Sequence, residues 1–319
     1  MKIVVVDHVH LEEEHIKKLR STAELEIFSE PPKTPEELKK RIESADIVIV
    51  GWSHLSKNIM DSTKKLKMIS IWATSCHYAD LNAAKERGIV VTHVPSYATE
   101  AVAEYTFTLL LAAVRRLPQA DRHVRNGGFD WRPFGGVELH GKILGVVGTG
   151  SIGLRVAEIA KVFHMRVLGY DKYPNKNRAK EVGIEYVDLS TLLNESDFVT
   201  LHVTLTSETK GLLGKNEIKA MKRGAVIINT SQGKVIDEKA LVDALRSGKI
   251  SYAGLDVFDN EPPNKNSPLF KLDNAVLSPH IGFHTVEAKK RCSDICIDNV
   301  MKFLEGHPQN TCQLNSSHV

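Results

Sequence analysis

The feature that most constrains this chain is a glycine-rich turn set between an apolar run and a helical stretch. Residues 142–153 read Lys-Ile-Leu-Gly-Val-Val-Gly-Thr-Gly-Ser-Ile-Gly, so Gly148, Gly150 and Gly153 form the pattern G-x-G-x-x-G. A strand-like run precedes the turn, a helical stretch follows it, and the next strand-like run ends at Asp171. That context, more than the glycine spacing alone, predicts the first βαβ unit of a dinucleotide-binding sheet.

The three glycines of this turn, the helix that follows and Asp171 each have a physical role in such a unit. Gly148 allows the tight turn, Gly150 lets a pyrophosphate approach the backbone, and Gly153 lets the helix pack close to the strand. The helix N-terminus offers free N–H groups and a positive dipole end to the phosphates. Asp171 can accept hydrogen bonds from the adenosine ribose, and its charge repels a 2′-phosphate, which favours NAD as the cofactor.

Two alternatives to an NAD site stay open at this point. A glycine-rich turn also occurs in α/β domains that bind no nucleotide. In addition, Lys172 and Arg178 lie close to Asp171 in the sequence, and cations at such positions suit the 2′-phosphate of NADP.

Apolar runs alternate with polar helical stretches along the whole chain. In the first hundred residues the strand-like runs are 3–6, 46–50, 68–72 and 89–94. From Gly141 onward they are 143–147, 166–170, 198–203, 225–229, 252–257 and 275–278. This alternation predicts the α/β class, with two Rossmann-like domains, one flavodoxin-like and one doubly wound and NAD-binding, and a cleft between them.

Two helical segments set the expected domain boundaries. The stretch 100–116 has no Gly or Pro and is almost wholly apolar in its second half, so we expect a buried helix. The last helical segment, 286–305, follows the second sheet and is expected to pack back on the first domain. We therefore expect a discontinuous domain of residues 1–98 plus 285–319 and a continuous domain of residues 99–284.

The composition argues against several classes of protein. The 319 residues are 42% hydrophobic, which is enough for a large core, and the net charge of +3 comes from Lys and Arg spread along the chain. A nucleic-acid partner is therefore not expected. The chain opens directly on a strand-like run, so we expect no secretory segment, and no apolar run is long enough to span a membrane. We expect a cytoplasmic protein without a membrane partner.

The four cysteines are expected to be free thiols, as is usual in a reducing compartment. They are Cys76, Cys292, Cys296 and Cys312. Cys292 and Cys296 have helical spacing, but no further histidine or cysteine lies at ligand spacing, so no metal site is predicted. The polar segment after Pro308 has a weak helix signal and is expected to be a loose tail.

Further motifs follow the glycine turn in a characteristic order. They are the segments 201–211, 228–233, 253–262 and 278–282, with 80–89 and 94–104 before the turn. Together they resemble the D-isomer-specific 2-hydroxyacid dehydrogenase family, and they lean towards its glycerate dehydrogenase and hydroxypyruvate reductase branch. The resemblance covers nearly the whole chain.

The resemblance implies an NAD-dependent oxidoreductase that acts on a CH–OH group. Such an enzyme interconverts a 2-oxo acid, or a related carbonyl compound, and a D-2-hydroxy acid by hydride transfer. The resemblance also implies that the first domain binds the small-molecule substrate and the second binds NAD. It further implies a homodimer, in which the long helix from Glu100 would suit the contact between subunits.

The resemblance places a catalytic pair just after two of the predicted strands. His280 would donate a proton to the developing alkoxide during reduction and act as a base in the reverse direction. Glu261 would pair with His280, raise its pKa and fix its orientation. Taken singly, His280 is more typical of a structural histidine and Glu261 of a surface carboxylate. Their family-like motifs favour the catalytic interpretation.

Other positions carry over from the resemblance one by one. Asp256 corresponds to the aspartate that bonds the nicotinamide carboxamide, and Thr74 lies in a loop that meets both cofactor and substrate carboxylate. The remaining expected cofactor contacts are Ser151, Ile152, Val203, Thr230, Ser231 and Gly282. The expected substrate-binding residues are Trp52, Ser75, Cys76 and Gln232, and Gln232 is also expected among the catalytic residues with His280 and Glu261.

Gln232 is the main departure from the family pattern. At this place the family reads Asn-Thr-x-Arg-Gly, and its arginine grips the substrate carboxylate and polarises the carbonyl. Glutamine keeps hydrogen-bond donors but lacks the charge and the bidentate fork. Simple 2-oxo acids are therefore expected to react slowly unless His77, Arg132 or Lys234 supplies the missing charge. A second departure is Ser75, where the related branch usually has glycine.

Three functions stay open after these observations. The first is a dehydrogenase of this family with an altered substrate. The second is a conventional 2-oxo acid reductase, in which another cation substitutes for the arginine or the glutamine was introduced by substitution. The third is a catalytically silent NAD-binding regulatory or scaffold protein. The presence of both Glu261 and His280 counts against the third, because a silent protein has no chemical need for them.

Overall fold

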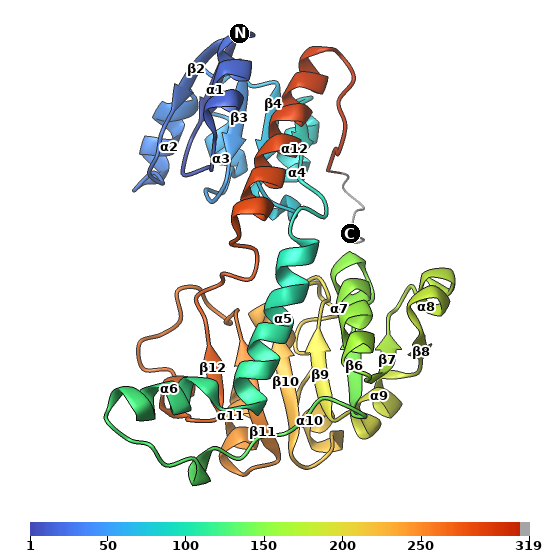
Figure 1. Ribbon diagram of the computed structural model, residues 1–319. Coiled ribbons are helices and arrows are strands. Elements are labelled where there is room, and N and C mark those ends of the chain that lie inside the picture. The colour runs from blue at the N-terminus through green and yellow to red at the C-terminus, as the bar shows by residue number, and fades with distance from the viewer. Residues whose placement is uncertain (313–319) are drawn as a thin grey trace. The chain divides into compact units, whose positions relative to one another are not determined.

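The computed structural model describes residues 1–312, which belong to two compact units (Figure 1). Unit 1 comprises Met1–Ala98 and the chain from Thr285 onward, and unit 2 comprises Thr99–His284. Each unit is built on one parallel sheet, so the predicted α/β class with two parallel sheets is confirmed. Among residues 1–312, the helices are all too short or too polar to cross a membrane.

Unit 1 contains a five-stranded sheet with the order β2-β1-β3-β4-β5. Its strands are β1 (Lys2–Val5), β2 (Glu24–Ile27), β3 (Ile47–Val50), β4 (Met68–Ile71) and β5 (Val90–Thr92). Its helices are α1 (Glu13–Arg20), α2 (Pro35–Ile42), α3 (Lys57–Met60), α4 (Leu81–Glu86) and α12 (Val286–Leu304), with a short 3-10 turn η1 (Cys76–Tyr78). Strands β3 and β4 are buried along their whole length, as expected for parallel strands covered on both faces.

The last helix of the described chain, α12, packs against β4 of unit 1. The indole Nε1 of Trp72 donates a hydrogen bond to Ser293 Oγ at 2.9 Å, and Ser70 Oγ donates to the carbonyl of Cys296 at 3.2 Å. Cys292 and Cys296 are fully buried on this face. The chain thus returns to unit 1 after completing unit 2.

Unit 2 contains a seven-stranded sheet with the order β12-β11-β10-β9-β6-β7-β8. Its strands are β6 (Ile143–Val147), β7 (Arg166–Tyr170), β8 (Ile184–Tyr186), β9 (Phe198–Leu201), β10 (Ala225–Asn229), β11 (Ile250–Leu255) and β12 (Ala275–Leu277). Its helices are α5 (Thr99–Val114), α6 (Leu117–Arg125), α7 (Ser151–Val162), α8 (Lys176–Val182), α9 (Leu189–Glu195), α10 (Lys215–Ala220) and α11 (Glu238–Arg246). Three short 3-10 turns complete it, η2 (Arg132–Phe134), η3 (Gly233–Val235) and η4 (Pro268–Lys271). The direction of strand succession reverses between β6 and β9, where doubly wound sheets bind their ligands.

The predicted buried helix is α5, which lies on the unit 2 sheet. Its residues Leu109 and Leu110 are almost completely buried. A side chain at Gly254 of β11 would bring its Cβ within 3.0 Å of the Leu109 Cβ, so the glycine permits this close packing. The helix ends where Arg116 adopts a left-handed conformation with φ of 53°.

Strands β2 and β8 were not predicted from the sequence, and both are edge strands. Their sequences, Glu-Leu-Glu-Ile and Ile-Glu-Tyr, carry charges that the solvent-facing side of an edge tolerates. In β2, Glu26 pairs with Lys2 at 2.7 Å, and in β8, Glu185 pairs with Arg166 at 2.7 Å. Such short charged segments do not show the apolar runs by which the other strands were predicted.

The prediction of four free thiols is wrong for two cysteines, because Cys76 and Cys312 form a disulfide with 6.1 Å between their Cα atoms. The predicted loose tail is also wrong up to residue 312. The N–H of Cys312 donates to the carbonyl of Val91 at 2.8 Å, and Thr311 pairs with Thr92. Tertiary folding brings these cysteines together across a separation of 236 residues, which the sequence pattern does not show. The rest of the predicted tail, 313–319, lies outside the described residues.

Candidate active site

The candidate site residues of unit 2 follow the carboxyl ends of its strands. The glycine turn follows β6, Asp171 follows β7, Val203 follows β9, Thr230 to Gln232 follow β10, Asp256 and Glu261 follow β11, and His280 follows β12. Because the seven strands are parallel, these residues share one edge of the sheet. That edge is where open α/β sheets bind their ligands.

The three glycines of the turn meet different surroundings. Gly148 has φ of 90°, and a Cβ there would lie 2.6 Å from the carbonyl oxygen of His202. A Cβ at Gly153 would lie only 2.0 Å from the carbonyl oxygen of Gly148. A Cβ at Gly150 would meet nothing within 4 Å. The fold itself therefore requires the first and third glycines, whereas the second borders open space.

The N-terminus of α7 lies beside that open space. Gly150 is the N-cap residue, and no side chain caps the helix. The N–H groups of Ser151, Ile152 and Gly153 precede the first intrahelical bond, which Leu154 makes to the carbonyl of Gly150 at 2.9 Å. Uncapped N–H groups beside an open space fit the pyrophosphate of a dinucleotide.

Asp171 is held against the glycine turn by its carboxylate. Its Oδ2 accepts hydrogen bonds from the N–H of Thr149 at 2.6 Å and from the Thr149 hydroxyl at 3.0 Å. Its Oδ1 accepts the N–H of Tyr173 at 2.9 Å. The Thr149 hydroxyl also lies 2.7 Å from the hydroxyl of Tyr186 on β8. Sequence reasoning missed Thr149 and Tyr186, although Thr149 lies inside the glycine pattern.

The two cations that left NADP open are both paired with carboxylates. Lys172 lies 2.5 Å from Glu208. Arg178 lies 2.5 Å from Glu181 and 3.6 Å from Glu158. Their charges are therefore partly neutralised within unit 2.

His280 and Glu261 are in direct contact. The Nδ1 of His280 donates to Glu261 Oε2 at 2.7 Å, and the N–H of Phe258 donates to Glu261 Oε1 at 3.1 Å. The side chains of His280 and Glu261 are 44% and 38% exposed. With Nδ1 engaged, Nε2 is the ring nitrogen that can meet a substrate, and within residues 1–312 it has no hydrogen-bond partner.

The contact shifts the pKa of both groups towards the charged pair. The hydrogen bond to Glu261 raises the pKa of His280 above its ordinary 6.5, although burial opposes the rise. Burial alone would raise the pKa of Glu261, but the hydrogen bond and charge of His280 outweigh it, so this pKa falls below 4.5. The arrangement thus favours an imidazolium beside a carboxylate, which suits a general acid.

Asp256 organises the loop that carries His280. Its buried carboxylate accepts hydrogen bonds from Ser278 Oγ at 2.6 Å and from the N–H groups of Ile281 at 2.9 Å and Gly282 at 2.7 Å. The carbonyl of Asp256 accepts the N–H of His280 at 2.9 Å. His280 itself has a left-handed φ of 56°. The structure shows this role of Asp256 in the loop, whereas its expected contact with the cofactor stays a prediction.

The turn around Gln232 is built by the buried Asn229. The amide of Asn229 accepts the N–H of Ser231 at 3.0 Å and donates to the carbonyl of Gln232 at 2.8 Å. A Cβ at Gly233 would lie 2.0 Å from the backbone carbon of Phe258. The turn with Gln232 therefore packs directly on the loop that leads to Glu261.

Two further predicted cofactor residues lie near the glycine turn and α5. The buried Thr230 hydroxyl lies 3.1 Å from that of Thr106. A methyl of Val203 would lie 2.8 Å from a Cβ placed at Gly148.

The three cations suggested as substitutes for the arginine differ in their surroundings. Arg132 is paired with Asp130 at 2.8 Å. His77 Nδ1 lies 2.5 Å from Ser75 Oγ, and desolvation lowers the pKa of His77 below its ordinary 6.5, which favours the neutral ring. Lys234 is exposed and lies two residues beyond Gln232. Of the three, Lys234 is the one nearest to Gln232 in the sequence.

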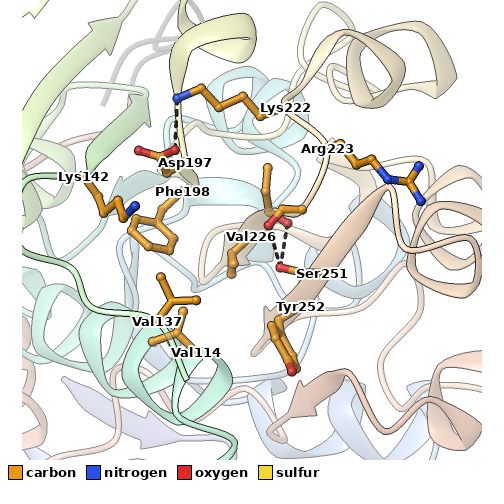
Figure 2. Close-up of a pocket in the computed structure, with 12 residues that line it drawn as sticks. Val114, Val137, Lys142, Asp197, Phe198, Lys222, Arg223, Val226, Ser251 and Tyr252 are labelled. Carbon is orange, nitrogen blue, oxygen red and sulfur yellow. Dashed lines mark hydrogen bonds and ion pairs between the residues drawn. The ribbon is translucent and has the colours of Figure 1, made fainter. Parts of the chain in front are cut away.

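One pocket, of about 180 Å³, lies at the opposite, amino-terminal edge of the unit 2 sheet (Figure 2). Lys222 beside it is paired with Asp197 at 3.0 Å. The Ser251 hydroxyl donates to the carbonyl of Gly224 at 2.7 Å, and Arg223 points away from the pocket. The pocket thus lies at the edge of the sheet away from the glycine turn and His280, and it does not belong to the candidate site.

A cluster of possible metal ligands in unit 1 is already neutralised. Atoms of Glu14, His15 and Asp294 lie within 4.8 Å of one another. The ammonium of Lys290 lies 2.5 Å from Glu14 and 3.4 Å from Asp294. We interpret this cluster as an ionic contact that joins α1 and α12.

In unit 1, Trp52 lies at the carboxyl edge of the sheet, on a loop held by the buried Asp7. The Asp7 carboxylate accepts the N–H groups of Gly51 at 2.7 Å, Trp52 at 3.0 Å and Ser53 at 2.6 Å. The Trp52 indole donates to the carbonyl of His8 at 3.1 Å and is 45% exposed. Asp7 was not identified from the sequence, although an acidic residue at the end of a buried strand indicates a functional or structural role.

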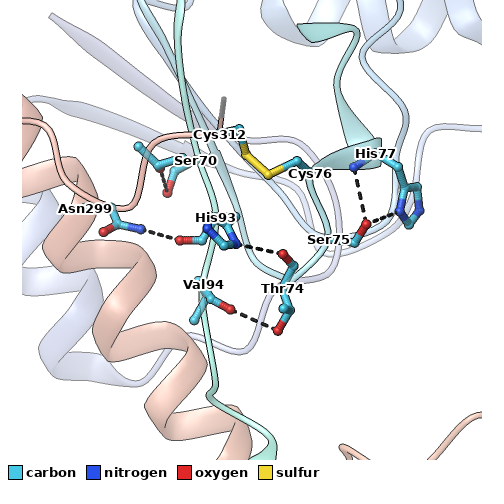
Figure 3. The surroundings of a disulfide bond; sticks show 10 residues. Ser70, Thr74, Ser75, Cys76, His77, His93, Val94, Asn299 and Cys312 are labelled. Carbon is cyan, nitrogen blue, oxygen red and sulfur yellow. Dashed lines mark hydrogen bonds between the residues drawn. A yellow bond between two sulfur atoms is a disulfide. The ribbon is translucent and has the colours of Figure 1, made fainter. Parts of the chain in front are cut away.

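The neighbouring loop 73–78 follows β4 at the same edge of unit 1 (Figure 3). Thr74 Oγ1 donates to the carbonyl of Val94 at 3.0 Å, and the Thr74 carbonyl accepts His93 Nδ1 at 2.7 Å. Ser75 bonds locally to His77, and the sulfur of Cys76 is bonded to Cys312. Contrary to the expectation of a free thiol, Cys76 has none to offer a substrate.

Comparison with known proteins identifies a matching family and several related sequences. Residues 107–282 match the family described as D-isomer specific 2-hydroxyacid dehydrogenase, NAD binding domain. The chain is 41% identical to a D-3-phosphoglycerate dehydrogenase of Methanocaldococcus jannaschii over 96% of its own length, but it spans only 58% of that relative. It is 40% identical to a glyoxylate reductase of Korarchaeum cryptofilum over 92% of the chain and 90% of the relative.

Solved structures with related sequences have the same fold. An acyclic imino acid reductase in complex with NADPH and D-arginine gives a TM-score of 0.90 at 35% identity, over 98% of this chain and 100% of that one. A D-lactate dehydrogenase of Aquifex aeolicus with NAD and lactic acid gives 0.84 at 32% identity, over 96% of both chains. The family match and these relatives agree with the glycine turn of unit 2, and the chain belongs to the D-isomer specific 2-hydroxyacid dehydrogenase family.

Proposed function

We propose that this protein is an NAD-dependent reductase that converts a 2-oxo acid into a D-2-hydroxy acid and catalyses the reverse oxidation. The observation that carries the proposal is the His280–Glu261 pair, 2.7 Å apart, at the same sheet edge as the glycine turn. A proton donor and a nucleotide site are the two components that reduction of a carbonyl group requires.

The residues of unit 2 divide the work of the reaction. When bound, the nicotinamide cofactor supplies hydride to the carbonyl carbon. His280 Nε2 gives its proton to the carbonyl oxygen, so that the C=O group gains one hydride and one proton. Glu261 stabilises the imidazolium before the transfer and holds the ring through Nδ1. Asp256 and the loop it organises keep His280 in place.

We propose NAD rather than NADP as the cofactor. The carboxylate of Asp171 is fixed beside the glycine turn, where it can accept the ribose hydroxyls and repel a 2′-phosphate. Lys172 and Arg178 are paired with other carboxylates. One relative of solved structure binds NADPH and another binds NAD, so the family as a whole does not decide the matter.

The two units are proposed as the two functional domains. Residues 99–284 bind the cofactor through Gly148, Gly150, Gly153 and the α7 N-terminus. Residues 1–98 with 285–319 bind the substrate, with Trp52 and loop 73–78 as the contributing parts. The backbone N–H groups of that loop are proposed to receive the substrate carboxylate.

Gln232 shapes the proposed choice of substrate. Without the guanidinium of the family pattern, the carbonyl is less polarised and the carboxylate less tightly held. We therefore propose low turnover on the simplest 2-oxo acids, such as glyoxylate, and higher turnover on a substrate with an additional polar group.

Reduction of a 2-imino acid to a D-amino acid is a second candidate function. The neutral side chain of Gln232 favours it, because an iminium carbon is already cationic and an arginine beside it would be repelled. The likeness to an acyclic imino acid reductase supports the same candidate.

The protein is also proposed to form a homodimer. In unit 2, α6 and the loop after it expose large apolar side chains, which is costly for a monomer. They are Leu117, Val124, Phe129 and Trp131, at 62%, 57%, 96% and 81% exposure. A second copy of the chain is the partner we propose for them.

The function is tested by following NADH oxidation with a panel of substrates. The panel contains glyoxylate, pyruvate, hydroxypyruvate and larger 2-oxo acids, each with and without ammonia, for the natural chain and for Gln232→Arg. We expect Gln232→Arg to raise kcat/KM on glyoxylate by about 10²-fold, in line with restoring one group that stabilises developing charge.

The possible outcomes separate the candidate functions. No gain in Gln232→Arg on any simple 2-oxo acid would contradict the role assigned to this position. Turnover that requires ammonia favours the imino acid candidate. Binding of NADH without turnover on the whole panel would support a catalytically silent protein and reject the proposal.

A further inference from the structure

The disulfide joins residues 309–312, here called the C-terminal segment, to loop 73–78 of unit 1 (Figure 3). Cys76 lies in the 3-10 turn of that loop, and Cys312 comes directly after the bridge between Thr92 and Thr311. Both bonded cysteines are only partly buried, whereas Cys292 and Cys296 are fully buried. The disulfide is therefore the sulfur pair that a reagent in solution can reach.

Apart from the disulfide, the C-terminal segment is held by a short backbone pairing and by two side-chain hydrogen bonds to α12, from Gln309 Nε2 to Asp298 Oδ2 at 2.6 Å and from Asn310 Nδ2 to Asn299 Oδ1 at 2.8 Å. The segment lies along β5, which is an edge strand of the unit 1 sheet. The N–H of Cys312 donates to the carbonyl of Val91 at 2.8 Å, and the N–H of His93 donates to the carbonyl of Asn310 at 3.0 Å. A pairing this short is marginal by itself. The disulfide thus adds a covalent attachment to a segment that is otherwise held by a short pairing and by hydrogen bonds.

The segment and the loop also share the residue His93. Its backbone N–H bonds the C-terminal segment at Asn310, and its ring Nδ1 donates to the carbonyl of Thr74 in the loop at 2.7 Å. Its carbonyl accepts the side-chain amide of Asn299 at 2.9 Å, and the Asn299 oxygen accepts the amide of Asn310 at 2.8 Å. Release of the segment would therefore remove two supports of loop 73–78. One is the disulfide, and the other is the hydrogen bond between His93 and Asn310 that helps to hold His93 beside Thr74.

We propose that Cys76 and Cys312 form a reversible redox site that takes a dithiol as its co-reactant and controls loop 73–78. This inference rests on the proposed function, because that loop is assigned there to the substrate carboxylate. The oxidised protein holds the loop in the conformation described here, and reduction frees both the loop and the C-terminal segment.

The chemistry is a thiol–disulfide exchange in two steps. A thiolate of the dithiol attacks one sulfur, which breaks the Cys76–Cys312 bond and forms a mixed disulfide. The second thiol of the dithiol then displaces the remaining cysteine. Two electrons and two protons reach Cys76 and Cys312, and the dithiol becomes a cyclic disulfide. The oxidised reagent reverses both steps.

The remaining two cysteines do not compete in this exchange. Burial raises the pKa of the Cys296 thiol to about 12 and raises that of Cys292 as well. Thiols of such high pKa form little thiolate, which is the reactive species. A redox response of the protein is thus assigned to one pair of sulfurs.

The test uses the full chain equilibrated with dithiothreitol or with its oxidised form, after which the reagent is removed. Titration of thiols in denaturant should give two in the oxidised protein and four in the reduced protein. The KM for the best 2-oxo acid should rise at least about threefold on reduction, with a smaller change in kcat, because a preorganised loop is lost. Hydrogen exchange at the amides of His93 and Cys312 should accelerate by about tenfold or more.

Two variants separate the redox site from a general effect of the reagent. Cys312→Ser should have the high KM and fast exchange of the reduced protein in either condition. Thr311→Ser is the matched control in the same segment, and it should keep the full response because the disulfide remains.

Each result bears on the inference. Four thiols under all conditions, or a reduced protein with unchanged KM and unchanged exchange at both amides, would overturn it. If no substrate is turned over, but reduction still adds two thiols and accelerates both amides, the proposed function fails and the redox site stands.

Discussion

At the scale of single residues, the pH dependence of the reaction follows from the hydrogen bond between Glu261 and His280. In the proposed mechanism reduction requires protonated His280, whose pKa lies above 6.5, so the rate should fall only as the pH rises through that elevated pKa. Oxidation requires neutral His280 and should rise over the same range. In Glu261→Gln, the largest influence that raises the pKa of His280 is removed, so the descending limb for reduction should move to lower pH. Profiles of kcat/KM against pH for both proteins check this, and superimposable profiles would contradict it.

The same bond contributes to folding stability only within a pH window. The raised pKa of His280 gives stability that is complete below 6.5 and is lost as the pH rises through the folded pKa. The lowered pKa of Glu261 gives stability that is complete above 4.5 and is lost as the pH falls through the folded pKa. Between these limits both contributions are present. Since both side chains are more than a third exposed, the effect on stability is small and the effect on the reaction is the one to measure.

At the scale of elements, different glycines of the turn between β6 and α7 are expected to serve folding stability and cofactor binding. Gly153→Ala places a Cβ 2.0 Å from the carbonyl oxygen of Gly148, so we expect a loss of about 1–3 kcal/mol in the free energy of unfolding. Gly150→Ala meets open space in the protein, so its stability should stay within about 1 kcal/mol of the natural chain.

For Gly150→Ala, the affinity for the cofactor rather than the stability is expected to fall. The Cβ of Gly150→Ala would project into the space proposed for the pyrophosphate, so NADH affinity should fall at least about tenfold, or ~1.4 kcal/mol. Thermal unfolding and fluorescence titration with NADH measure the two effects. A Gly150→Ala protein that binds NADH normally would place the pyrophosphate elsewhere.

The sequence predicts the elements with strong apolar periodicity better than the others. Buried strands such as β3 and β10 and the second half of α5 are continuous apolar runs, so tertiary context agrees with the local signal. The edge strands β2 and β8 lack that signal because one side of each meets solvent. The glycine turn could be interpreted in advance because Gly148 and Gly153 lie where a local close contact leaves no room for a side chain.

The candidate site could be predicted only in part for a related reason. His280, Glu261 and Gln232 lie in motifs that can be recognised in the sequence. Asp7 and Asp256 hold loops through bonds to backbone N–H groups, and such roles depend on which loop a strand end faces. The disulfide between Cys76 and Cys312 depends on the same long-range placement, so no local sequence pattern predicts it.

At the scale of the whole molecule, the exposed apolar side chains after α5 predict the oligomeric state. Phe129 and Trp131 are 96% and 81% exposed. If a second copy covers them, the double variant Phe129→Ser, Trp131→Ser should shift the protein from dimer to monomer. Sedimentation velocity at micromolar concentration measures the change. A natural chain that sediments as a monomer would remove the need for this surface to bind a second copy.

The central claim is that this chain reduces a carbonyl compound with a proton from His280, and one comparison tests it most directly. It is the rate of NADH oxidation on the best substrate of the panel, for the natural chain and for His280→Asn, with NADH affinity measured in parallel. The account predicts that kcat falls by about 10²–10⁴-fold in the variant while NADH affinity is retained, as for loss of a general acid. Equal rates in the two proteins would contradict it.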